Sequence, residues 1–564
     1  MQRRARAVCT RCHGRKVRCD LEGRPSGNCS RCEHEGHTCQ PHVGPRKQRK
    51  ALRSSLHSSD TSLLSLSRTA PAVTHECTVQ EATPSPFQPL GHRDISCLGP
   101  NNVNGWQQPN SIDGSQLILD TSQACRLPPP VIAHAFADFY FRELFYFVPV
   151  LDYGQSEIPS STLLQQCLCF AGSTMRQKTG PAEWTTFAIY GRIKTLLFLH
   201  HDPAPLNMLS ALCILSTWLP YSPDAIVLDN PWQWAGMGIR LAIQLHLHED
   251  ETYSRLEHPG RARRIWWYLV INDTMQTACC GRPGMFPLET SVPLPVPSDF
   301  KDPDLGSRVF CHLVDLCTSL RKVLDLARVD NTSSEEAYLI LETLGLRRQS
   351  WPFEIQLFDT ESRRPYSRAV TELHIFYLVT VILICFLGRR DNPSLFKFAS
   401  MTASCCVSRL YEEIIYHEDV QYLLPIHSWV NLVAGIPRAF SDSGALNPDR
   451  DEELRISTQV LETMSEKHTS AAYVLDKING LNKMHADAFP AQSDNTWGAF
   501  SVPEQMKVVQ LFPFPSSFCP MLSLLGTVET SETQPPDVLV TSSMDSNDWP
   551  IDWSFFLFDG PMSF

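Results

Sequence analysis

The sequence lacks several motifs that would indicate an enzyme or a secreted protein. It contains neither a G-x-S-x-G nucleophile elbow nor a phosphate-binding P-loop. No apolar segment of the secretory type precedes its first cysteines, no membrane span is evident, and strand-like alternation of apolar and polar residues is scarce. We therefore expect no enzymatic activity, no membrane association, no disulfide framework and no β-rich fold.

Six of the 20 cysteines form two copies of one triplet near the N-terminus. They follow the spacing C-x2-C-x6-C-x9-C-x2-C-x6-C, at Cys9, Cys12, Cys19, Cys29, Cys32 and Cys39. Two tetrahedral zinc ions need eight ligand bonds, so six thiolates suffice only if two of them bridge both metals. The repeat indicates the first cysteine of each half, Cys9 and Cys29, as the bridging pair. A disulfide knot or six unrelated cysteines agree less well with this repeat.

Basic residues surround these cysteines. Six thiolates and two divalent ions leave a formal charge of −2, which favours cationic neighbours. Residues 1–53 hold 14 Lys and Arg against 4 Asp and Glu, a net charge of +10, so the remaining chain carries −21 within the total of −11. A module with this charge is typical of a polyanion binder whose affinity falls steeply with salt.

The cysteine spacing, with the basic run Cys12–Asp20, resembles the fungal binuclear zinc-cluster (Zn2Cys6) transcription factors. The resemblance implies two Zn²⁺ ions in a thiolate-bridged cluster and a short helix that enters the major groove of double-stranded DNA. It also implies that Lys16 reads a CGG-type triplet, since a lysine can donate to guanine O6 and N7. Arg15, Arg18 and Arg11 are then expected to contact phosphates. Balancing the thiolate charge is the alternative role for each of them.

Residues 46–126 are expected to form a mostly disordered linker, because Ser, Thr, Pro, Gln and Asn dominate and no apolar period is sustained. The basic run Arg46–Lys50 is typical of a nuclear-import signal, so we expect a nuclear protein. Four leucines fit two heptads of a coiled coil that Ser59 interrupts: Leu52, Leu56, Leu63 and Leu66. This short pattern leaves a homodimer open.

From residue 127 to about 525 the composition becomes rich in Leu, Ile, Phe, Trp and Ala at helical spacing. The sequence therefore predicts a large all-α domain. The expected helices are 131–148, 160–172, 184–200, 206–219, 231–247, 261–279, 308–326 and 369–388. The last is the most apolar, and Glu372 and His374 near its start favour a buried helix over a membrane span.

Residues 127–390 resemble the middle homology domain of fungal transcription factors, nearest to regulators of cutinase and fatty-acid utilisation. Three segments carry the resemblance: Tyr140–Asp152, Trp232–His248, and Arg263–Trp267 with Gly281–Pro283. Family members often have a glycine where His246 stands.

Two pairs of residues in these segments invite a closer interpretation. His246 and His248 would point away from each other on a helix, so we expect no shared metal ion. Arg263 and Arg264 precede two tryptophans, and we expect them to form ion pairs with acids at helix ends.

The C-terminal residues 526–564 interleave aspartates with tryptophan and phenylalanine. Acidic residues keep aromatic ones exposed, so we expect a disordered tail that binds coactivators. The alternative is a tail that packs its aromatic side chains onto the helical domain.

Taken in order, the sequence predicts a Zn2Cys6 DNA-binding domain in 1–45, a linker in 46–126, an all-α regulatory domain in 127–525 and an activation tail in 526–564. The predicted function is that of a sequence-specific RNA polymerase II transcription factor. We expect an activator of one fungal gene cluster for secondary metabolism. A regulator of carbon or lipid catabolism, a repressor with the same DNA module, and a metabolite-sensing helical domain are the alternatives.

Overall fold

The computed structural model divides the chain into two compact units, Met1–Ile95 and Ser96–Phe564. It describes residues 9–15, 19–21, 28–37, 39–40, 114–152, 159–176, 182–221, 225–280, 283–286, 290–327, 334–388, 393–439, 450–488 and 502–526. Lys16, Arg18, the run Arg46–Lys50, the leucines of the proposed coiled coil and the C-terminal residues 527–564 lie outside these ranges.

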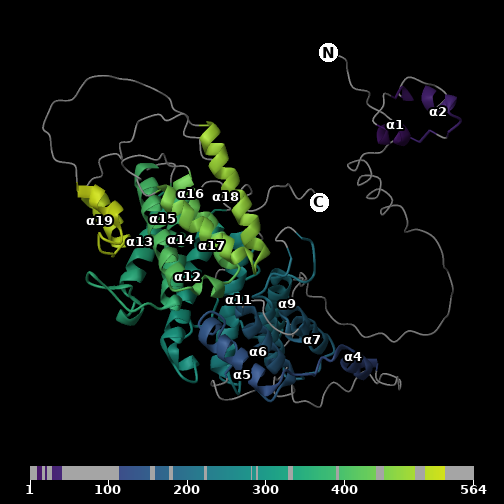
Figure 1. Cartoon of the computed structure of the whole chain (residues 1–564), viewed down its shortest axis with the longest axis horizontal. Coiled ribbons are helices and arrows are strands. Elements are labelled where there is room, and N and C mark those ends of the chain that lie inside the picture. Colours follow the sequence, from purple (N-terminus) through teal and green to yellow (C-terminus); the bar gives the residue numbers. More distant parts are fainter. Residues whose placement is uncertain are drawn as a thin grey trace, which may run out of the picture. The chain divides into compact units, whose positions relative to one another are not determined.

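The first unit contains two short helices, α1 (Thr10–Gly14) and α2 (Ser30–His34), drawn in purple in Figure 1. Each helix begins directly after the first cysteine of a triplet. The buried side chains of the described part are cysteines, and the apolar side chain packed against them is Leu21. So small an apolar core cannot hold a fold by hydrophobic burial alone, and bound metal is a common substitute.

The second unit is mainly helical over the residues that the structure describes. Its α-helices are α4 (Gly114–Ser122), α5 (Pro130–Phe139), α6 (Thr162–Met175), α7 (Thr186–Phe198), α8 (Pro205–Leu215), α9 (Pro231–Gln244), α10 (Asp250–Tyr253), α11 (Pro259–Cys280), α12 (Leu305–Leu326), α13 (Ser334–Gln349), α14 (Arg368–Gly388), α15 (Pro393–Tyr416), α16 (Ile426–Ala439), α17 (Arg450–Ser465), α18 (Thr469–Ala488) and α19 (Val502–Leu511). A π-helix, η3 (Tyr140–Leu144), follows α5. Short 3-10 turns are η4 (Ala182–Trp184), η5 (Pro297–Asp299), η6 (Phe353–Ile355), η7 (Asp419–Tyr422) and η8 (Pro520–Gly526).

Each of the eight ranges predicted as helical contains a helix. Helices α10, α13 and α15–α19 lie outside these ranges but within the predicted all-α domain. Two features depart from that prediction. The first is a small antiparallel hairpin of β1 (Phe358–Asp359) and β2 (Ser362–Arg363). The second is α4, which lies inside the range expected to be linker and leads to the fully buried Ala124. The helical unit therefore begins earlier than residue 127.

Local sequence explains where several helices begin. The side chain of Ser161 accepts from the backbone N–H of Leu164 at the start of α6, and Asn230 accepts from Gln233 at the start of α9. These polar N-cap residues satisfy backbone donors that the first turn of a helix leaves unpaired. Proline occupies the first position of α5, α8 and α9. It favours a helix start because its φ is already helical and it has no N–H to leave unpaired.

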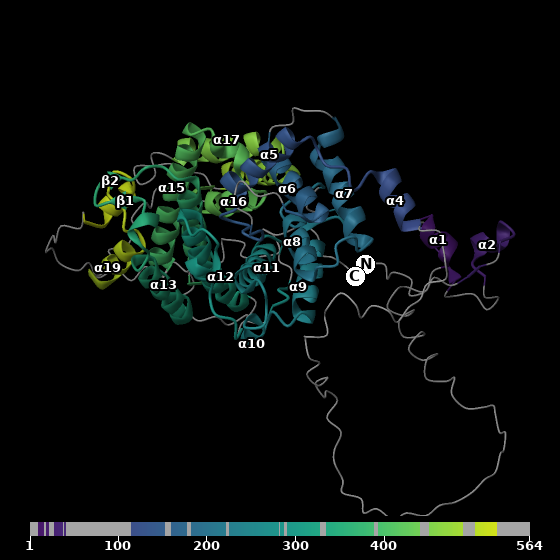
Figure 2. The same cartoon turned by 90° about the horizontal axis from the view of Figure 1, so that it is seen from below.

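Helices α11 and α12 lie between two groups of helices in the second unit, as Figures 1 and 2 show. On one side α11 packs against α8 and α9, and on the other α12 packs against α13 and α14. Helix α14 is long and apolar enough to cross a membrane by length and composition, but 94% of its apolar window is buried inside the structure. It contacts α12, α13, α15 and α16. The prediction of a buried helix agrees with this packing.

Two of the segments that carry the family resemblance, Tyr140–Asp152 and Arg263–Trp267, meet in the core. The guanidinium of Arg264 donates to the carbonyl of Pro149 (2.7 Å) and forms an ion pair with Asp152. Arg263 pairs with Asp299 at 2.5 Å. The predicted ion pairs are therefore confirmed, although only Asp299 ends a helical turn, whereas Asp152 lies in a segment without regular secondary structure.

The backbone at the end of α9 adopts a conformation that favours glycine. His246 has a φ of 58°, in the left-handed region, and its N–H donates to Ile243 while that of Leu247 donates to Ala242. This pattern is a Schellman motif, in which glycine avoids the strain that a side chain causes. Because His246 has left the helix, its ring stacks on that of His248 with 5.9 Å between centroids. The prediction that these two rings point apart is wrong.

Candidate metal centre and nucleic-acid interface

The six N-terminal cysteines form two overlapping groups. One group is Cys9, Cys12, Cys19 and Cys29, and the other is Cys9, Cys29, Cys32 and Cys39; within each, all sulfur atoms lie within 4.8 Å of one another. Cys9 and Cys29 belong to both groups, so they occupy the positions expected of bridging ligands.

Sulfur–sulfur distances in these groups fit zinc coordination. The Sγ atoms of Cys9 and Cys29, of Cys9 and Cys32, and of Cys12 and Cys29 are each 3.8 Å apart. A tetrahedron with Zn–S bonds of about 2.3 Å has edges of about 3.8 Å. The arrangement therefore fits two tetrahedra that share an edge.

Hydrogen bonds join the two halves in a repeated pattern. Within each half, the backbone N–H of the first cysteine donates to the sulfur of the third, Cys9 to Cys19 at 3.4 Å and Cys29 to Cys39 at 3.3 Å. Between the halves, the N–H of Thr10 donates to the carbonyl of Gln40, and that of Ser30 to the carboxylate of Asp20. Each helix therefore starts against the residue that follows the third cysteine of the other half.

The thiols of the shared pair differ electrostatically from their neighbours. Burial alone would raise the pKa of Cys9, but hydrogen bonds from the backbone and side chain of Cys12 and from further thiols lower it to about 6. The backbone N–H of Cys32 lowers the pKa of Cys29. Burial raises the pKa of Cys12 well above its usual value and that of Cys32 to about 12. Without metal, Cys9 and Cys29 therefore lose a proton more readily than Cys12 and Cys32.

Two of the four expected DNA contacts lie in the described part of this unit. Arg11 lies on α1, and Arg15 is the first residue after that helix. The guanidinium groups of both form ion pairs with the carboxylate of Glu35 in the second half, with N–O distances of 3.1 and 3.3 Å. Arg15 is 55% exposed. The sequence did not predict that Glu35 would join the basic side chains of the first half. The other two contacts, Lys16 and Arg18, are outside the described residues.

Comparison with known protein families agrees with both units. Residues 7–49 match the fungal Zn(2)-Cys(6) binuclear cluster domain, and residues 134–344 match the fungal specific transcription factor domain. The cofactor is therefore two Zn²⁺ ions in a binuclear cluster, for which the grouped cysteines are positioned. No solved structure matches the chain.

Several curated relatives are acetamidase regulatory proteins. The one from Aspergillus fumigatus is 26% identical over 336 residues, which cover 55% of this chain and 42% of the relative. Those from Aspergillus oryzae and Emericella nidulans are each 27% identical, cover 41% of this chain, and match 29% and 28% of their own lengths. The matches thus span less than half of each of these relatives. The predicted nearness to regulators of cutinase and fatty-acid utilisation is not confirmed.

These findings agree on a regulatory rather than an enzymatic role. The relatives are named as regulators, and the two matched domains imply a nuclear protein. Together, the cysteine geometry and the two matched domains support a fungal Zn2Cys6 transcription factor, a DNA-binding regulator of transcription.

Proposed function

We propose that the chain binds CGG-type triplets in double-stranded DNA and activates RNA polymerase II transcription of one fungal pathway. The observation that carries the proposal is the pair of cysteine groups that share Cys9 and Cys29. In our assignment these two bridge both zinc ions. Cys12 and Cys19 complete one tetrahedron, and Cys32 and Cys39 complete the other.

In the proposed complex, Lys16 contacts the bases while Arg11, Arg15 and Arg18 contact phosphates. The pairing with Glu35 is compatible with this role. A guanidinium carries five N–H groups in a fixed plane, and only part of them is needed for one carboxylate. The N–H groups that Glu35 does not use can donate to phosphates, for which the carboxylate is a competitor.

The regulated pathway has two candidates. Our first proposal is a gene cluster for secondary metabolism. The names of the relatives favour a second, because an acetamidase acts on a simple amide and its regulator would control a catabolic gene. Expression profiling after deletion of the gene separates the two. The genes whose expression falls would be either clustered biosynthetic genes or dispersed catabolic ones.

The test of DNA recognition is selection of random double-stranded DNA with the full chain. We expect enriched CGG-type triplets that disappear with a zinc chelator and with Lys16→Ala. Salt-sensitive binding without an enriched motif would overturn sequence-specific recognition. Paired triplets at fixed spacing would indicate a homodimer, and single triplets a monomer.

The C-terminal residues 526–564 are proposed to recruit coactivators, on the strength of their interleaved acidic and aromatic residues. Fusing them to an unrelated DNA-binding domain should activate a reporter, and replacing Trp549 and Trp553 by alanine should abolish the effect. A silent fusion would favour the repressor alternative.

A further inference from the structure

The second unit contains a pocket of about 150 Å³ that the proposed DNA recognition does not use. It lies where the chain leaves α8 and enters α9, and it extends between α11 and the pair α16 and α18. Apolar side chains such as Met275, Trp429 and Leu432 make up most of its lining. A concave, mainly apolar site with a few polar groups is the usual form of a small-molecule site.

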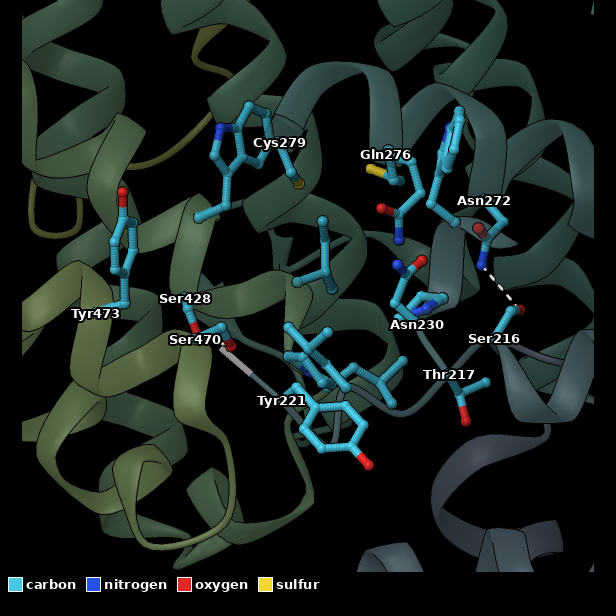
Figure 3. A pocket seen from close by; sticks show the side chains of 18 of the residues that line it. Ser216, Thr217, Tyr221, Asn230, Asn272, Gln276, Cys279, Ser428, Ser470 and Tyr473 are labelled. Atoms are coloured by element: carbon cyan, nitrogen blue, oxygen red, sulfur yellow. Dashed lines mark hydrogen bonds between the residues drawn. The ribbon is translucent and has the colours of Figure 1, made fainter. Parts of the chain in front are cut away.

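Polar groups occupy two separated parts of this pocket, as Figure 3 shows. On one side, the amide nitrogen of Asn272 donates to the hydroxyl groups of Ser216 (3.0 Å) and Tyr268 (3.2 Å). On the other, the hydroxyl groups of Ser428 and Ser470 lie 3.1 Å apart. These side chains come from α11, α16, α18 and the end of α8, so the fold brings them together from distant parts of the sequence.

The oxygen of the Asn272 amide is a buried acceptor. It has no hydrogen-bond partner within the described part of the chain, although the nitrogen of the same amide has two. In Figure 3 the nitrogen turns toward Ser216 and the oxygen turns away from it. A buried acceptor without a donor is costly, and a ligand that brings an N–H or O–H group removes that cost.

The charge of the lining restricts the ligand further. None of the described side chains that line the pocket is a lysine, arginine, histidine, aspartate or glutamate. An ionised ligand would lose its hydration there without gaining an opposite charge, whereas an uncharged one would not. The volume suits a molecule of roughly one or two aromatic rings.

From these observations we propose that the pocket binds a small, uncharged, mainly apolar molecule that donates a hydrogen bond to Asn272. All the residues that line the pocket belong to the second unit, and none is a cysteine of the zinc cluster. It is therefore tested separately from the proposed function.

The experiment is titration calorimetry of the full chain with matched probes. We expect 1-naphthol and indole to bind. Their counterparts without a donor, 1-methoxynaphthalene and 1-methylindole, should bind about tenfold more weakly, which is the effect of one hydrogen bond. The ionised 1-naphthoate should not bind. Absence of saturable binding by both 1-naphthol and indole would overturn the proposal, as would equal binding of the donor and donor-free probes.

Two variants locate the site. Asn272→Leu should reduce 1-naphthol binding to the level of 1-methoxynaphthalene and leave the latter unchanged. Ala225 lines the pocket from the segment between α8 and α9. Because the large side chain in Ala225→Trp would fill the pocket, this variant should abolish binding of both probes. Circular dichroism melting checks that each variant is folded. If Asn272→Leu does not fold, Ala225→Trp decides, and unchanged binding in a folded Ala225→Trp chain would overturn the assignment to this pocket.

Discussion

Arg11 and Glu35 form an ion pair of 3.1 Å that joins the basic half of the cysteine module to its acidic half. Arg15 reaches the same carboxylate. Two of the side chains that we propose as phosphate contacts, Arg11 and Arg15, are thus held by a residue of the other half, and this gives the first prediction.

Replacing Glu35 by glutamine should tighten binding to DNA and steepen its dependence on salt, because two guanidinium groups lose a competing carboxylate. The stability of the module should change by less than about 1 kcal/mol, since the pair is partly exposed. Fluorescence anisotropy across a salt series measures the effect. Glu33→Gln makes the same charge change two residues earlier, on α2, and an equal effect of both variants would contradict a specific role for Glu35.

Replacing Cys9 or Cys29 by serine should remove both zinc ions, because each is assigned to two tetrahedra. Cys39→Ser should remove mainly one. Elemental analysis should find about two zinc ions per wild-type chain and the same in Cys125→Ser, which changes an exposed cysteine outside the module. Equal zinc loss in Cys9→Ser and Cys39→Ser would contradict the bridging assignment.

Replacing His246 by glycine should stabilise the helical unit by about 1 kcal/mol, because glycine adopts the left-handed conformation at a helix end without strain. Thermal unfolding measures the shift. His248→Gly serves as the control, since that position has no positive φ in the described chain. A stabilisation of similar size at both positions would show that loss of the stacked rings, not the backbone, is responsible.

Replacing Gly172 by alanine should destabilise the helical unit by about 3 kcal/mol, since its new Cβ would lie 2.1 Å from the backbone oxygen of Phe136. The two helices α5 and α6 cross at this point. Gly191→Ala is the matched control on α7, where nothing lies within 4 Å. There alanine should stabilise by roughly 0.5–1 kcal/mol. Chemical denaturation compares the two, and similar losses in both would contradict the close approach.

Acidification should destabilise the helical unit partly through His374. Burial, aided by the charge of Arg348, holds the pKa of His374 well below its ordinary value of 6.5. The unfolded chain therefore binds a proton below about pH 6.5 that the folded chain does not, and stability falls as the pH decreases, by up to about 1.4 kcal/mol per pH unit for this group. His374→Gln should show a shallower fall between pH 7 and pH 5. An unchanged slope would assign the effect to other groups.

The helices and the metal ligands follow from the sequence because both depend on local spacing. The apolar period places α6 and α11 within a few residues of their observed bounds, and the cysteine repeat alone indicates Cys9 and Cys29 as the pair shared by both groups. The hairpin at β1 and β2 escapes such reasoning, since two-residue strands carry no detectable alternation.

The remaining features depend on contacts between distant segments. The pocket joins Ser216 to Ser470 across the fold, and the ion pair of Arg11 with Glu35 crosses the two halves of the module. The error at His246 has a different origin. The sequence extends the helical period through residue 247, whereas α9 ends three residues earlier, at Gln244, and the ring of His246 turns toward His248.

Arg261 and Arg264 donate hydrogen bonds to the carbonyls of Val150 and Pro149, respectively. These bonds limit where the chain can be truncated. A fragment that begins after Asp152 keeps both buried cations but loses three of their acceptors, the carbonyls of Val150 and Pro149 and the carboxylate of Asp152. Truncations that start there would misfold, and the silence of a reporter would then record a broken core instead of a missing regulatory signal. Boundaries placed before α4 avoid this confusion.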